Sequence, residues 1–274
     1  MIYLTKKDLI EFEGDRTVYH YTSIYTCIES IFPLNRLRLS PVTLASDPME
    51  HLSPNQSVSY CGYDEDHLRL NNNIDGFEIS EKINKYYKSL HQLCLCRNSE
   101  IIFEEQFTGV FETIDHFGFV KPRMWDQYGD KFGGVCIALS RKKLTEQLSS
   151  DFRIIDVLYK KYKLFKQNID NSGVDLNIIE QIGEQKYLEL KYKLEIKKLS
   201  IKHNDYKDEN ECKVITATED NYAYIDISKC IQGIFFTNNL NYVYESLLKN
   251  TAKEYNIPLI QIDIRRTGIN IHSF

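Results

Sequence analysis

Residues 122–139 constrain the fold of this chain more than any other stretch, because they combine a helix, a glycine pair and an apolar strand. Trp125 and Tyr128 are three positions apart, which places them on one face if this segment is helical. Gly133 and Gly134 allow a backbone or a ligand to approach where a side chain would not fit. We expect the segments before and after this unit to supply the two halves of a pocket.

Hydrophobic patterning along the chain predicts short strands mixed irregularly with helices. The expected strands cover 17–21, 36–40, 92–97, 135–139, 152–159, 211–216, 222–226, 231–237 and 258–264. Helices are expected over 5–12, 24–32, 78–90, 142–148 and 240–255, with Thr22 or Ser23 as the cap of the second. Over 174–200 the alternation of Leu with Glu and Lys permits a strand, but length and composition favour one long helix.

This mixture predicts one α+β domain over 1–274 rather than a doubly wound sheet. Two segments are expected to be insertions in that domain. Residues 53–77 carry Asn, Gly, Ser and Asp with little periodicity, which indicates an irregular insertion, and 160–204 is expected to be a helical one.

Charge and cysteine content narrow the function classes. The net charge is -5, so no global basic field indicates nucleic-acid binding, although basic stretches near 141–166 and 191–203 could form a local groove. The 7 cysteines include no Cys-x-x-Cys pair and no signal peptide precedes them, which predicts reduced thiols and a cytoplasmic location. No apolar run approaches the roughly 18 residues of a membrane span, so no membrane association is expected.

The first candidate site segment is His20, Tyr21 and Thr22, at the end of the first long strand. A histidine there can hydrogen-bond a ribose hydroxyl, and the following backbone groups can hold an amide. The alternative is a half-buried strand histidine followed by an ordinary helix cap. Tyr128 is the second candidate, because its ring could stack on a flat heteroaromatic ligand, but a Trp and a Tyr one helical turn apart are also typical of a core.

The third candidate is the pair Glu209 and Glu211, which run into the strand over 212–216. Two glutamates two apart on a strand point the same way and can face one cleft. One carboxylate could then stabilise positive charge on a sugar carbon while the other orients the attacking group. A solvated strand edge is the alternative. No phosphate-loop or zinc motif is present. A magnesium nuclease would use Asp47, Glu50 and the acidic run of Asp205, Asp208 and Glu209.

Four segments together resemble a bacterial family long without an assigned function, over residues 17–264. They are Val-Tyr-His-Tyr-Thr-Ser at 18–23, Leu-Arg-Leu-Ser-Pro and Ser-Asp-Pro-Met-Glu at 37–50, Met-Trp-Asp-Gln-Tyr-Gly followed by Gly-Gly-Val-Cys-Ile at 124–137, and Asp-Glu-Asn-Glu-Cys-Lys-Val at 208–214. That family is similar to ADP-ribosyltransferases. Among those relatives, the resemblance leans toward nucleic-acid-modifying toxins of phage-defence toxin–antitoxin systems (DarT-like).

The resemblance implies an ADP-ribosyltransferase-like split β-sheet core with flanking helices, and NAD as substrate without a metal. His20 would hold the nicotinamide ribose and the backbone of Tyr21 the carboxamide, supported by Thr22. Tyr128 would stack on the nicotinamide, and Trp125 would belong to the same cofactor-binding set.

The same resemblance makes Glu211 the catalytic residue and Glu209 its helper. It implies a mono-ADP-ribosyltransferase toxin with a nucleic-acid acceptor, RNA first, and a possible antitoxin partner. A protein acceptor is the close alternative. The rival interpretations are a non-catalytic module that senses a nucleotide or binds a partner, with Glu209 and Glu211 in solvent and no cleft beside His20, and a magnesium-dependent nuclease.

Overall fold

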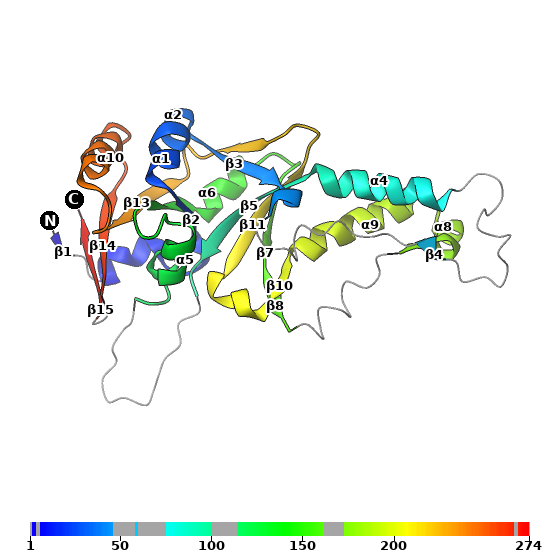
Figure 1. The fold of residues 1–274 in the computed structure, drawn as a ribbon, viewed down its shortest axis with the longest axis horizontal. Helices are drawn as coiled ribbons and strands as arrows, with labels where there is room; N and C mark the ends of the chain where they lie inside the picture. Colours follow the sequence, from blue (N-terminus) through cyan, green and yellow to red (C-terminus); the bar gives the residue numbers. More distant parts are fainter. Residues whose placement is uncertain are drawn as a thin grey trace, which may run out of the picture.

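The computed structural model describes residues 2–3, 6–45, 58–59, 75–99, 114–161, 173–265 and 268–273. Its centre is an eleven-stranded, mostly antiparallel sheet (Figure 1). The strands are β1 (Ile2–Tyr3), β2 (Thr17–Thr22), β3 (Arg36–Pro41), β5 (Leu90–Arg97), β6 (Val135–Ser140), β7 (Arg153–Asp156), β11 (Glu211–Ala217), β12 (Ala223–Asp226), β13 (Ile231–Thr237), β14 (Leu259–Arg265) and β15 (Gly268–Ser273). The expected α+β class is confirmed at this level.

The strand order is β1–β15–β14–β13–β6–β2–β5–β11–β7, and β3 pairs with both β5 and β12. The expected strand over 152–159 is two strands, β7 and β8 (Leu158–Lys160), because the chain changes partner after Val157, whose N–H bonds to Glu211, whereas that of Leu158 bonds to Ser200. β8 pairs in parallel with β10 (Ile201–His203), and β4 (Val58–Ser59) pairs in parallel with β9 (Val174–Asp175).

Most helices are short and pack on the two faces of the sheet. They are η1 (Lys6–Phe12), η2 (Gly14–Arg16), α1 (Ile24–Thr26), the π-helical turn η3 (Cys27–Ile31), α2 (Phe32–Leu34), η4 (Val42–Leu44), η7 (Gly118–Val120), α5 (Pro122–Gln127), α6 (Arg141–Gln147), η8 (Asn204–Glu209) and α10 (Tyr242–Glu254). None of the helices in these described ranges is long and apolar enough to cross a membrane.

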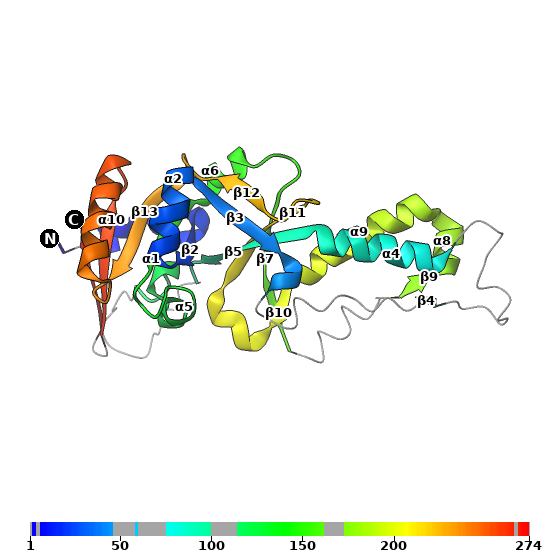
Figure 2. The same ribbon diagram turned by 45° about the horizontal axis from the view of Figure 1, so that its top comes forward.

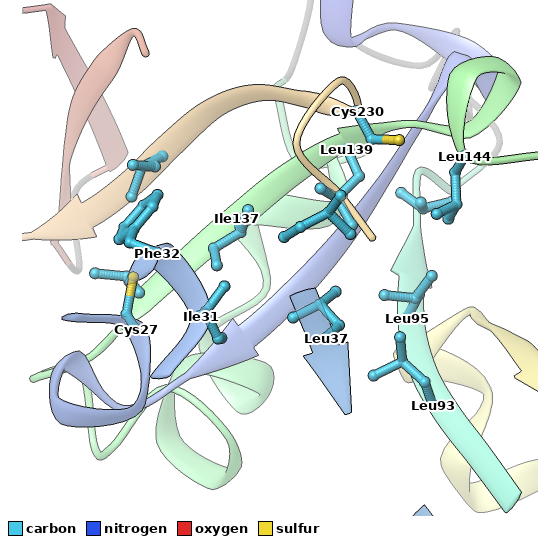
Figure 3. Close-up of a cluster of buried hydrophobic side chains, with 14 of the residues drawn as sticks. Cys27, Ile31, Phe32, Leu37, Leu93, Leu95, Ile137, Leu139, Leu144 and Cys230 are labelled. Carbon is cyan, nitrogen blue, oxygen red and sulfur yellow. The ribbon is translucent and has the colours of Figure 1, made fainter. Parts of the chain in front are cut away.

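Alternation along the strands builds two cores, one on each face of the sheet. On β2, Val18 enters the core under α1, α2, α6 and α10, whereas Tyr19 enters the core under η1, η7 and α5. Figure 3 shows the first core, where Leu37, Leu93 and Ile137 from three strands gather. Because both faces are covered, the central strands are fixed on both sides.

The sheet splits between β2 and β5. These two strands pair only through Val18 with Arg97 and Tyr19 with Cys96. Further along β5 the partner on this side is β3, which pairs at Gln92 and His91. The intervening residues 93–95 of β5 have no partner on this side among the described strands, and the opening they leave is where the candidate site lies.

A helical arm extends away from the sheet in both ribbon views (Figures 1 and 2). It consists of α4 (Gly76–Ser89), α8 (Leu176–Ile182) and α9 (Glu184–Leu199), with the rings of Tyr86 and Tyr192 stacked 4.0 Å apart between α4 and α9. The expected long helix over 174–200 is therefore helical but broken, because Gly183 has a φ of 83° that ends α8.

The two expected insertions fall partly outside the described residues, since 60–74 and 162–172 are not among them. The helix expected over 78–90 begins two residues earlier, at Gly76. Asp75 caps α4 by accepting a hydrogen bond from the N–H of Phe77 at 2.8 Å, so residues 75–77 already belong to a helix start.

Candidate functional site

A cavity of about 920 Å³ lies at the split between β2 and β5. This volume is at the upper end of the roughly 300–1,000 Å³ usual for small-molecule sites. Five of the seven predicted site residues line it, namely His20, Tyr21, Thr22, Tyr128 and Glu211. Residues from the front, the middle and the rear of the chain therefore meet around one space.

His20 lies near the end of β2, beside the unpaired edge of β5. Burial of its imidazole ring lowers the pKa of His20 to about 4, and a hydrogen bond with the backbone of Cys94 opposes that change without cancelling it. The ring is therefore neutral at pH 7. A neutral imidazole that already bonds one backbone group has a fixed orientation and can offer its other nitrogen to a ligand hydroxyl.

Tyr21 turns its side chain away from the site into the core. Its hydroxyl donates a hydrogen bond to the carbonyl of Gly118 at 2.6 Å, so its backbone is the part left to meet a ligand. Thr22 is buried and lines the cavity, but it is not the helix cap. Ser23 caps α1, because its Oγ accepts a hydrogen bond from the N–H of Thr26 at 3.1 Å.

The turn after α5 is held in an unusual backbone conformation. Asp130, Lys131 and Phe132 have φ values of 50°, 52° and 70°, three consecutive non-glycine residues in the left-handed region. The carbonyl of Phe132 accepts a hydrogen bond from Thr237 at 2.6 Å, which ties the turn to β13. A side chain at Gly134 would overlap the carbonyl of Thr22, so the close approach expected at this glycine occurs.

Trp125 and Tyr128 do not share a face. α5 ends at Gln127, and Tyr128 at its C-cap has left the helical conformation, with φ −120° and ψ −18°. Trp125 is fully buried, donates from Nε1 to the carbonyl of Phe119 at 2.8 Å and packs edge-to-face on Tyr21. It does not line the cavity, so it supports Tyr21 from behind and touches no ligand there.

Tyr128 is on the cavity wall with 40% of its surface exposed. Its hydroxyl lies 3.4 Å from Oε1 of Glu209, at the long end of hydrogen-bond distances. Burial, and then the Glu209 carboxylate, raise the pKa of Tyr128. The phenol is therefore protonated at any physiological pH, and its ring remains available for stacking.

Glu209 and Glu211 are not two residues of one strand. Glu209 ends η8, and Asn210 follows it in the left-handed conformation at φ 44° before β11 begins at Glu211. Both glutamates are nevertheless buried, which contradicts a solvated edge. Glu211 lines the cavity, whereas Glu209 lies behind it.

Lys202 connects the two carboxylates. Its Nζ lies 2.9 Å from Oε2 of Glu209 and 2.9 Å from Oε2 of Glu211. On its other oxygen Glu209 accepts from the guanidinium of Arg123 at 3.2 Å. Two buried acids and two bases thus form one cluster, because an unpaired buried charge would be strongly unfavourable.

Aromatic side chains enclose this cluster. The ring of Tyr206 lies 5.2 Å from Nζ of Lys202 and 5.5 Å from the guanidinium carbon of Arg123, within the range of cation–π contacts. The N–H of Glu211 donates to the hydroxyl of Tyr159 at 2.8 Å. Lys202, Arg123 and Tyr159 were not predicted, since no spacing in the sequence relates them to the glutamates.

A comparison with protein families finds a match to one part of the chain. Residues 124–214 match the family described as protein of unknown function (DUF2971). The matched segment begins inside α5 and ends in β11, so it contains Tyr128, Glu209 and Glu211 but not His20. Neither curated proteins nor solved structures gave a match to the chain.

In the part of the chain that the structure describes, no group of three or more His, Cys, Asp or Glu side chains could hold a metal ion. Asp47 and Glu50 of the nuclease interpretation lie outside the described residues, whereas its acidic run, Asp205, Asp208 and Glu209, lies in η8.

Proposed function

We propose that this protein is an NAD-dependent mono-ADP-ribosyltransferase toxin that modifies nucleic acid, with RNA as the favoured acceptor, in anti-phage defence. The observation that carries the proposal is the shared cavity lined by His20, Tyr128 and Glu211. A neutral imidazole, an aromatic ring and a buried carboxylate are the groups that the resemblance to ADP-ribosyltransferases requires in one place.

In this proposal the cavity binds the nicotinamide end of NAD. Tyr128 stacks on the nicotinamide ring, and the backbone of Tyr21 with Thr22 holds its carboxamide. The neutral His20 contacts a ribose hydroxyl. The dinucleotide is a substrate here and no metal takes part.

The reaction breaks the bond between C1′ of the ribose and the pyridinium nitrogen, whose electron pair leaves with neutral nicotinamide. Positive charge develops on C1′ and the ring oxygen. Glu211 is placed to stabilise that charge, and loss of one such preorganised group typically reduces kcat by about 10²–10³-fold. The acceptor then bonds to C1′ and releases its proton to solvent. Lys202 and Glu209 act as positioning residues, because Lys202 on the cavity wall pairs with Glu211 and is itself paired with Glu209 behind it.

The alternative with a protein acceptor uses the same chemistry and differs only in what reaches C1′. A non-catalytic module of the same fold is less well supported. That interpretation expects Glu209 and Glu211 in solvent and no cleft beside His20, whereas both glutamates are buried and His20 lines the cavity. An antitoxin partner belongs to the toxin proposal and is tested by co-purification from cells that carry the neighbouring gene.

The test is Glu211→Gln, which keeps the size of the side chain and removes its charge. Label transfer from radioactive NAD to RNA, DNA and protein, and the release of free nicotinamide, are measured beside a thermal melt. We expect both activities to fall by about 10²–10³-fold in a folded variant. Glu219→Gln is the matched control, because Glu219 is 80% exposed and pairs only at the surface with Lys85. Full activity in folded Glu211→Gln would remove the assignment.

A further inference from the structure

The ribbon formed by β3 and β12 carries an unusual outer face at the cavity mouth. Its inner side chains, Leu37, Leu39 and Ile225, belong to the first core. Its outer face is formed by Arg36 and Arg38 on β3 and by Tyr222 and Tyr224 at β12, all of them exposed. We call these four residues the arginine–tyrosine face. Figure 2 shows β3 and β12 side by side on the same edge of the molecule.

Each arginine lies over one tyrosine ring. The guanidinium carbon of Arg36 is 4.0 Å from the ring centre of Tyr224, and that of Arg38 is 4.5 Å from the ring centre of Tyr222. Stacking holds a guanidinium flat while its N–H groups point outward in the plane of the stack. The two cations are thus oriented in advance for bidentate contact with phosphate oxygens.

The residues of the arginine–tyrosine face contribute little to the stability of the fold. Within the described residues neither guanidinium forms an ion pair with a carboxylate. Asp226 is opposite Arg36 in the strand register, but its Oδ1 accepts a hydrogen bond from the N–H of Ser228 at 2.7 Å. Exposed cation–π pairs contribute only about 0.5–1 kcal/mol each. The core is filled from the opposite face of the same ribbon.

We propose that the arginine–tyrosine face binds a single-stranded nucleic acid and leads one of its nucleotides into the cavity, which rests on the function proposed above. Alternate residues on a strand are roughly 6.6 Å apart, a separation that suits neighbouring phosphates of an extended strand. Bases can stack on tyrosine rings or on stacked guanidinium planes, as is typical of single-strand binding.

The position of the face completes the argument. Arg36, Arg38 and Tyr224 line the same cavity as His20 and Glu211. A strand bound along β3 therefore passes the opening through which an acceptor must reach C1′. A local array of this kind also resolves the conflict with the net charge of -5, because binding needs two oriented cations and no overall basic field.

The experiment is a fluorescence-anisotropy titration with labelled single-stranded RNA and DNA oligonucleotides, without NAD, at several salt concentrations. In R36Q/R38Q we expect the Kd to rise at least tenfold. The slope of log K against log salt should fall by about 1.4, since each phosphate contact to a single strand contributes about 0.7. Y222L/Y224L should weaken binding while leaving that slope unchanged. K85Q/K253Q is the matched control, because it removes two exposed cations outside the cavity and outside both basic stretches, and it should change Kd less than twofold.

Three outcomes would overturn the inference. The wild type could fail to bind any oligonucleotide, or R36Q/R38Q could bind as well as K85Q/K253Q. R36Q/R38Q could also raise the KM for NAD tenfold with the oligonucleotide Kd unchanged, which would assign the arginines to the dinucleotide phosphates. Nicotinamide release by the wild type is measured separately and reports on the transferase proposal itself, so failure of one proposal is distinguishable from failure of the other.

Discussion

Lys202→Met tests the electrostatic design of the site. The lysine is 5% exposed, Glu209 1% and Glu211 4%, and Nζ is 2.9 Å from an oxygen of each glutamate. Removing one partner of a buried charge pair typically costs about 3–5 kcal/mol, because the remaining charge stays desolvated. For a chain of this size each kcal/mol lowers Tm by about 2–4 °C, so a decrease of roughly 6–20 °C is expected.

The assay is differential scanning calorimetry at pH 7 on four variants. Lys85→Met is the control, since its partner Glu219 is 80% exposed and an exposed pair contributes about 0–1 kcal/mol. Adding Glu211→Gln to Lys202→Met should recover part of the lost stability, because it removes the carboxylate that loses its counter-charge, whereas Glu209 keeps Arg123 as a partner. Glu211→Gln alone completes the cycle. If Lys202→Met melted within 1 °C of the wild type, the burial and pairing argued for this cluster would be wrong.

Two further predictions concern the cavity wall. The pKa of His20 is about 4 in the folded protein, whereas its ordinary value is 6.5. Between these pH values His20 is therefore protonated in the unfolded chain but neutral in the folded protein. The contribution of His20 to the free energy of unfolding is therefore fully present above pH 6.5 and falls by about 3 kcal/mol between that pH and pH 4. Urea unfolding at both pH values should show this loss in the wild type and not in His20→Asn. Trp125→Phe should lower stability by about 1–3 kcal/mol, since it leaves the buried carbonyl of Phe119 without its donor. Tyr128→Leu should instead raise the KM for NAD with little change in Tm, and equal loss of stability in the two variants would contradict the assignment of one ring to the core and the other to the cavity.

Local patterns predicted the strands well because their causes are local. The apolar run of β6 and the alternation of β3 reflect which face of each strand is covered, and both are visible in a few consecutive residues. The last strand, β15, was not predicted, since it is fixed by pairing with β14 and β1 and not by a pattern in its own residues. The break at Gly183 was missed for the opposite reason, because the helical composition on both sides outweighed one glycine.

The sequence predicted those residues of the candidate site whose side-chain chemistry alone suggests a role. His20, Tyr128 and Glu211 were proposed from their chemistry, and the structure places them around one cavity. Trp125 was assigned to the cofactor because spacing cannot show that α5 ends before Tyr128. Glu209 was placed on a strand because nothing in the sequence shows that Asn210 turns the chain there.

The role of Lys202 could not be predicted from the sequence, because it depends on which segments meet in the fold. Lys202 lies in β10, which is separated from α9 by Ser200 and forms three parallel pairs with β8. β10 and the last residue of β8, Lys160, belong to the segment 160–204, which the sequence predicts to be a helical insertion. Yet this segment supplies the positive charge between Glu209 and Glu211, without which two buried carboxylates would repel each other across the cavity wall. The segment is therefore part of the candidate site, and a variant that trims it loses the counter-charge of Glu211 together with α8 and α9.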